Sequence, residues 1–136
     1  MKKTIYIALV TLAVFSCKKE KSAPASTHNN LIGKWNLVVF SGGIAGGVYR
    51  PNGKATVEFN TDSTYKNYAN NLIVDQGTYH IRAMATPVYS PNVKDSVIYY
   101  STRSNTQSYV LKAPDTLLLF DYNITDGYSY KYVRIK

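Results

Sequence analysis

The sequence predicts an all-β protein: one eight-stranded antiparallel, up-and-down barrel over 31–136. Short segments of alternating apolar and polar residues follow one another along this part of the chain. Clusters of Gly, Pro, Asn and Asp separate these segments at hairpin length, and no segment keeps a helical period for more than about two turns. A meander of eight strands can close on itself, which removes both exposed sheet edges. Such a barrel either fills with side chains or holds one small ligand.

The predicted strands differ in how clearly the sequence marks them. We expect them at 31–40, 54–60, 63–69, 74–83, 95–101, 106–112, 115–121 and 128–136. The second is the clearest, because Ala55, Val57 and Phe59 alternate with polar residues. The first strand is expected to place these residues on one face: Leu31, Gly33, Trp35, Leu37 and Val39. The last strand is expected to place these residues on one face: Tyr128, Tyr130, Tyr132 and Arg134.

Turn residues fall between these strands. The pair Asp126-Gly127 is a strong hairpin signal, and Asp62 lies in another turn. The sequence SGGIAGG, at 41–47, predicts a glycine-rich loop at the barrel mouth. It lacks the Lys and Ser or Thr of a phosphate-binding loop, so we interpret it as a flexible connection that could gate a ligand. The prolines within 84–95 predict a second long loop.

The N-terminus has the features of an export signal. Two lysines precede an apolar run of about a dozen residues, which is too short for a stable membrane-spanning helix. The run ends at Cys17, and the segment resembles a bacterial lipoprotein signal with Ser16 before the cleavage point. The resemblance implies that 1–16 is removed, that Cys17 carries lipid, and that this lipid anchors the protein in the cell envelope. A plain secreted protein and a transmembrane helix remain the alternatives.

Charge and composition limit the number of domains and the kinds of partner. The chain has 136 residues, enough for one domain, and its formal net charge is +8. The polar segment 17–30 predicts a flexible linker whose lysines lie near anionic headgroups, and Lys18 resembles an outer-membrane sorting cue. The barrel segment contains only 11 basic and 7 acidic residues, so we expect no nucleic-acid partner. Cys17 is the only cysteine, which excludes a disulfide within the mature domain.

The barrel segment resembles a known family. The motif Gly33-Lys34-Trp35 is similar to the G-x-W motif in the first strand of lipocalins, and the whole chain resembles short lipocalin-like lipoproteins of Bacteroidota. The layout shared with those lipoproteins includes the segments VEFNTDSTY, GTYHI and DTLLL and a Tyr-rich last strand. The resemblance implies that Trp35 closes the bottom of the barrel, with Arg134 lying across its ring. It also implies that a small apolar molecule binds inside.

Catalysis has little support in the sequence. His80 is the only histidine of the barrel segment, and the alternation predicts that it faces solvent. No spacing of histidines or carboxylates is typical of a metal site, and most aspartates lie at turns or strand ends. We therefore expect no enzyme activity, no metal and no cofactor, although carboxylates distant in sequence can still meet in space.

Tyrosine is in surplus. The chain has 13 tyrosines, and all but Tyr6 lie beyond the leader. They can fill a small barrel, line a ligand cavity, or form stacking platforms on the outer surface. The candidate lining residues are Tyr79, Tyr99, Tyr109, Tyr128, Tyr130 and Tyr132. We expect an envelope lipoprotein that binds a small, partly apolar molecule; the alternative is an interaction module with a filled barrel and a protein or glycan partner. The oligomeric state stays open.

Overall fold

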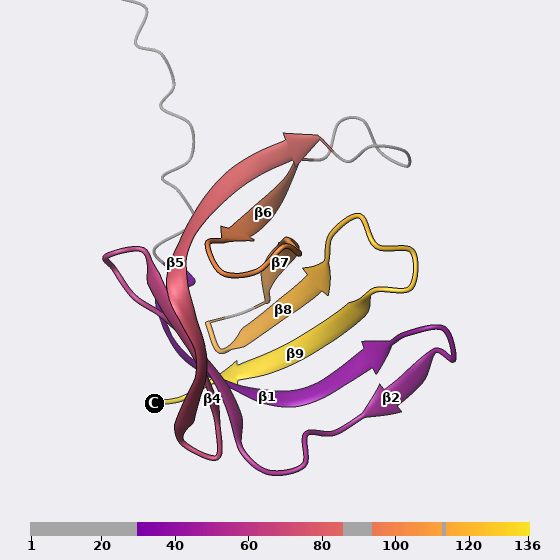
Figure 1. Ribbon diagram of the computed structural model, residues 1–136, viewed down its shortest axis with the longest axis horizontal. Helices are drawn as coiled ribbons and strands as arrows, with labels where there is room; N and C mark the ends of the chain where they lie inside the picture. Colours follow the sequence, from indigo (N-terminus) through magenta and orange to yellow (C-terminus); the bar gives the residue numbers. More distant parts are fainter. Residues whose placement is uncertain (1–29, 86–93, 113) are drawn as a thin grey trace, which may run out of the picture.

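The computed structural model describes residues 30–85, 94–112 and 114–136, and its described part is all β-structure (Figure 1). Its strands are β1 (Gly33–Gly42), β2 (Gly47–Tyr49), β3 (Ala55–Phe59), β4 (Thr64–Ala69), β5 (Leu72–Ala85), β6 (Lys94–Tyr100), β7 (Gln107–Lys112), β8 (Thr116–Asp121) and β9 (Tyr128–Arg134). Each predicted strand has a counterpart, and β2 is an addition. No described helix is long and apolar enough to cross a membrane.

The strands form a closed antiparallel barrel, which confirms the predicted fold class. The sheet order is β2-β1-β3-β4-β5-β6-β7-β8-β9, and β1 also pairs with β9. The N-terminal half of β1 pairs with β3, while β9 follows β1 from Trp35 to Gly42 on its other side. Eight strands therefore close the barrel. The short β2 pairs with the last residues of β1, on the same side of β1 as β3, which pairs with its first residues.

The glycine-rich segment 41–47 corrects the sequence prediction of a loop. β1 continues through Gly42, β2 begins at Gly47, and only 43–46 form the turn, in which Gly46 N–H donates to the Gly43 carbonyl at 2.9 Å. Positive φ angles of 75° at Gly43 and 63° at Gly46 favour this reversal. A side chain at Gly42 would collide with the backbone of Gly127 and Tyr128, and one at Gly43 with the Tyr128 ring. A side chain at Gly47 would collide with the Tyr49 hydroxyl.

A β-bulge in β1 corrects the predicted alternation of the first strand. Leu37 lies opposite Tyr132, but Val39 lies opposite Lys131, so Val38 is an extra residue. A bulge shifts the phase of the following side chains. Phe40 consequently lies opposite Tyr130 on the inner face, and Val39 faces outward. Period-two counting cannot anticipate this change, because no glycine or proline marks the bulge in the sequence.

The two ends of the barrel differ. The closed end comprises the start of β1, the β3–β4 turn and the end of β9, and the core begins there with fully buried Leu31, Trp35 and Phe59. The open end comprises the β1–β2, β4–β5, β6–β7 and β8–β9 connections. Figure 1 shows the β1–β2 and β8–β9 connections projecting on the same side of the molecule. β6 and β7 share only two paired positions, which makes their seam the shortest in the barrel.

Candidate functional site

Trp35 and Arg134 meet at the closed end. Trp35 is 0% exposed, and its indole Nε1–H donates to the Leu31 carbonyl at 2.9 Å. The guanidinium carbon of Arg134 lies 4.0 Å from the centroid of the indole ring, a cation–π distance. The two residues are also paired in register between β1 and β9.

Backbone carbonyls hold the Arg134 guanidinium in this position. Its nitrogens donate to the carbonyls of Pro114, Ile32 and Asn30 at 3.0, 2.8 and 2.5 Å. These bonds connect the end of β9 to the residues that precede β1 and β8. Gly33 leaves room for the guanidinium, since a side chain there would touch it and φ is 134°. This arrangement connects the two ends of the described chain, and the stacked side chains fill the space between them.

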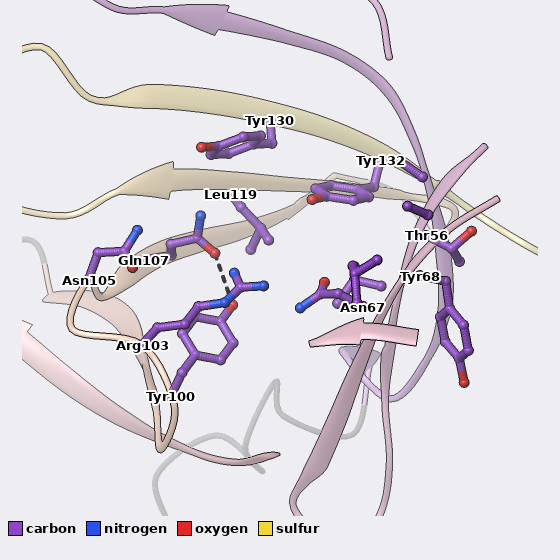
Figure 2. Close-up of a pocket in the computed structure, with 14 residues that line it drawn as sticks. Thr56, Asn67, Tyr68, Tyr100, Arg103, Asn105, Gln107, Leu119, Tyr130 and Tyr132 are labelled. Carbon is purple, nitrogen blue, oxygen red and sulfur yellow. Dashed lines mark hydrogen bonds between the residues drawn. The ribbon is translucent and has the colours of Figure 1, made fainter. Parts of the chain in front are cut away.

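A cavity of about 260 Å³ lies at the open end (Figure 2). Its volume is near the lower limit of small-molecule sites, which begin at about 300 Å³. Strands β3 to β9 and the β6–β7 connection contribute residues to its wall. Side chains that line it include Asn67, Tyr100, Gln107, Leu119, Tyr130 and Tyr132. The wall therefore combines aromatic rings with neutral amides, a composition suited to a ligand that is only partly apolar.

An ion pair borders this cavity. The Arg103 Nε and one terminal nitrogen each lie 2.6 Å from Asp75 Oδ2. The Tyr65 hydroxyl and the Thr102 hydroxyl donate to the same carboxylate at 3.0 Å each. Burial alone would raise the pKa of Asp75, but hydrogen bonds from Arg103, Tyr65 and Thr102 outweigh it and lower the pKa. Asp75 therefore stays ionised and holds the β6–β7 connection against β5.

A second hydrogen-bonded network, separate from the ion pair, lies in the cavity wall. The Tyr100 hydroxyl donates to Gln107 Oε1 at 2.9 Å, a bond drawn in Figure 2. Gln107 Nε2 donates to Asp121 at 3.0 Å, and the Tyr130 hydroxyl reaches that carboxylate at 3.4 Å. Burial, together with the negative charge of Asp121, raises the pKa of Tyr130 to about 12. These tyrosines are therefore protonated donors at neutral pH.

Tyr132 provides the cavity with an available hydroxyl. Burial raises the pKa of Tyr132 above its ordinary value, so the hydroxyl keeps its proton. None of the described residues forms a hydrogen bond with this hydroxyl. Its ring lies along the cavity wall beside Leu119 in Figure 2. A bound molecule can therefore use it as a donor or an acceptor.

The six candidate tyrosines lie in four places. Tyr130 and Tyr132 line the cavity. Tyr79 and Tyr109 are 8% and 6% exposed and belong to the core below it, where the Tyr79 ring meets Phe59 edge-on at 5.1 Å. Tyr128 lies at the rim against Phe40, with ring centroids 6.1 Å apart.

Tyr99 lies on the outer face of the barrel and does not line the cavity. Its neighbours Ile98 and Tyr100 belong to the core, so alternation along β6 points the Tyr99 ring outward. The ring stacks on exposed His80 at 4.9 Å, with the Arg82 guanidinium 5.5 Å from its centroid. Cys17 and nearly all of the linker lie outside the described residues.

Sequence reasoning missed several residues of the open end. The sequence does not predict Asp75, Tyr100, Arg103 or Gln107 as site residues. One available signal was the position of Asp75 directly after three apolar residues, where a carboxylate needs a partner. Its partner Arg103 is 28 residues away, and no local pattern connects the two.

The rim of the open end exposes aliphatic side chains. Ile44 is 93% exposed, and Val48 and Leu72 are 74% and 72% exposed. They lie at the β1–β2 and β4–β5 connections. Within the described residues, no group of three His, Asp or Glu side chains could hold a metal ion.

Comparisons with known proteins gave no match: no protein-family model, no curated protein and no solved structure matches this chain.

Proposed function

We propose that the protein is a non-enzymatic binding protein that takes a small, partly apolar molecule into the open end of its barrel. The cavity of about 260 Å³ carries this proposal, because it combines Tyr130 and Tyr132 with amides at the open end of the barrel. Burial of apolar ligand surface would supply affinity at roughly 25 cal/mol per Å². Hydroxyl and amide groups would orient the ligand.

The absence of catalysis is part of the proposal. The carboxylates near the cavity already have structural partners: Asp75 binds Arg103, and Asp121 accepts from Gln107 and Tyr130. The lowered pKa of Asp75 also makes it a poor proton donor at neutral pH. These features support binding without chemistry and require no metal or cofactor.

Anchoring in the cell envelope is proposed from the leader. The resemblance of 1–17 to a lipoprotein signal supports lipid on Cys17 and a location in the outer membrane. The described chain enters the barrel beside Trp35 and Arg134, at the closed end. The proposed ligand site lies at the opposite, open end.

The test is binding of a neutral fluorescent probe, 1-N-phenylnaphthylamine, together with native mass spectrometry of residues 22–136. This span contains the whole described barrel, and circular dichroism checks that it folds. We expect saturable fluorescence or a co-purifying small molecule, and at least tenfold weaker probe binding after Tyr132→Ala. The matched control Tyr99→Ala, on the outer face, should bind normally. A bare mass without saturable probe binding would overturn the proposal.

A second candidate is an envelope interaction module. The exposed aliphatic rim favours it, since Ile44 in the β1–β2 turn is 93% exposed and Val48 in the adjoining β2 is 74% exposed. Envelope preparations treated with a crosslinker distinguish the two functions. An interaction module should lose a specific crosslinked partner after Ile44→Ser and keep it after Tyr132→Ala. A small-molecule carrier should show the opposite dependence in probe binding.

A further inference from the structure

An aromatic row leads from the cavity to the outside of the barrel. Tyr130 lines the cavity, and Phe40 lies opposite it across the β1–β9 pair. Their rings are stacked with centroids 6.3 Å apart. Phe40 also pairs with Tyr49 of β2, and those rings are stacked at 5.3 Å. The row therefore joins a cavity residue to Tyr49, which is 43% exposed beyond the rim.

The outer end of the row borders a second hollow. This shallow depression of about 420 Å³ is lined by the β1–β2 turn, Tyr49, Tyr128 and Asp126. The backbone there is glycine-rich, and the Tyr128 ring lies against Gly43, where a side chain would be too close to its hydroxyl. The surface outside the cavity is therefore formed largely by aromatic rings that pack against glycine backbone. A ligand longer than the cavity could continue along this surface.

Charge around the two hollows disfavours an anionic ligand. Arg103 is already neutralised by Asp75. Asp126 lines the outer hollow, and Asp121 accepts hydrogen bonds from the cavity residues Gln107 and Tyr130. Among the described residues neither carboxylate forms an ion pair, so their negative charges would repel a carboxylate or phosphate. A fatty acid or a phospholipid headgroup is therefore a poor match, and a neutral ligand fits better.

The polar groups of the cavity match hydroxyl groups. Asn67 donates its Nδ2–H to Asp75 and keeps its Oδ1 as an acceptor, and the Tyr132 hydroxyl can act as donor or acceptor. Both ends of the Gln107 amide already bond Tyr100 and Asp121. Sugar hydroxyls also donate and accept. A pyranose ring has, in addition, an apolar C–H face, which packs against the negative face of an aromatic ring. A ligand with both properties in every unit fits both the cavity and the aromatic row.

We infer that the ligand is a neutral oligosaccharide, with one sugar ring against Tyr130 in the cavity and a further ring against Tyr49 outside it, while Phe40, stacked between these two rings, stays covered. This inference rests on the proposed function, because it places the first ring in the same cavity. It adds Tyr49 as a second subsite, outside the barrel. A single aromatic stack contributes about 0.5–1.5 kcal/mol, equivalent to roughly a twofold to tenfold change in affinity.

Calorimetric titration of the full chain, held in phosphocholine micelles, tests this inference. The probes are glucose and cellotriose, a flat β-1,4-linked trisaccharide. We expect cellotriose to bind at least tenfold more tightly than glucose. Tyr49→Ala should weaken cellotriose binding about fivefold and leave glucose binding unchanged. The outer-face variant Tyr99→Ala should change neither affinity, and a preserved thermal transition checks the fold of both variants.

The outcomes separate this inference from the proposed function. Equal affinity for the two sugars, or an equal effect of Tyr49→Ala on both, would overturn the oligosaccharide assignment. Binding of 1-N-phenylnaphthylamine that cellotriose does not displace would also overturn it, while leaving a carrier of apolar molecules in place. If neither the sugars nor the fluorescent probe bind, both proposals fail.

Discussion

The two ends of this barrel use similar residues to different effect: one end is filled and the other encloses a cavity. At the closed end an aromatic ring and an arginine, Trp35 and Arg134, stack, and the arginine uses backbone carbonyls as partners. At the open end Arg103 also lies over aromatic rings, 5.2 Å from Tyr100, but its partner is the carboxylate of Asp75. The closed end is filled by its stack, whereas the open end encloses a cavity of about 260 Å³.

The difference shows how backbone irregularity accompanies a cavity. β1 contains a bulge between Leu37 and Val39, and β5 is shifted against β4 between Asn67 and Tyr68. Both irregularities lie in the half of the barrel nearer the open end. Bulges bend strands and redirect side chains, here sending Phe40 inward. The regular pairing of Gly33 to Asn36 with β3 surrounds the filled end.

Removal of the indole should have the largest effect on stability. Trp35→Ala deletes a fully buried ring and also leaves Arg134 without its cation–π partner. We expect the free energy of unfolding to fall by about 3–5 kcal/mol. Urea denaturation followed by circular dichroism measures the change. A loss below about 1 kcal/mol would contradict the role given to the closed end.

A smaller loss is expected from Gly33→Ala. The new methyl group would meet the Arg134 guanidinium, and φ at this position is 134°, which an alanine rarely adopts. We expect a decrease of about 1–3 kcal/mol in the free energy of unfolding. Gly46→Ala is the matched control, because nothing lies near its added methyl group, although its φ is also positive. Equal losses in the two variants would mean that the contact with Arg134 contributes nothing.

The open-end ion pair predicts a pH-dependent effect. Asp75→Asn removes the counter-charge of a partly buried arginine and should lower stability at pH 7 by about 1–3 kcal/mol. The folded pKa of Asp75 lies below its ordinary value of about 3.9. Its contribution is therefore complete above about pH 4 and disappears as the pH falls through the folded pKa. Denaturation midpoints measured between pH 7 and pH 2 should show a shallower acid decline in the variant than in the natural chain. Parallel declines would exclude this role of Asp75.

The smallest effect on stability is expected at Tyr132. Because no described residue hydrogen-bonds to its hydroxyl, Tyr132→Phe should change the free energy of unfolding by less than about 0.5 kcal/mol. Tyr100→Phe is the contrasting variant: it leaves Gln107 Oε1 without its donor and should lose about 1 kcal/mol. Thermal unfolding scans compare the two. A larger loss for Tyr132→Phe would show that its hydroxyl already serves the fold.

The sequence predicts the regular part of this protein better than its cavity. Period-two alternation locates all eight barrel strands, since side chains on a half-buried strand must alternate. Alternation also places Tyr130 and Tyr132 on one face of the last strand, and the Trp35–Arg134 contact that the resemblance implies makes this the inner face. The inward direction of Phe40 cannot be predicted from alternation, because a bulge that the sequence does not mark changes the phase of β1. The pairing of Asp75 with Arg103 depends on how two distant connections meet, and the position of Tyr99 depends on which of two adjacent tyrosines faces the core.

Mapping where a ligand binds tests most directly whether the open end is the binding site. Amide NMR spectra of residues 22–136, recorded during titration with 1-N-phenylnaphthylamine, report the environment of each residue. Binding at the open end should change the shifts of Gln107, Tyr130 and Tyr132 and leave those of Trp35 and Arg134 unchanged. Shift changes concentrated at the closed end or around Tyr99, or none at saturating probe, would contradict the claim that the open end is the binding site.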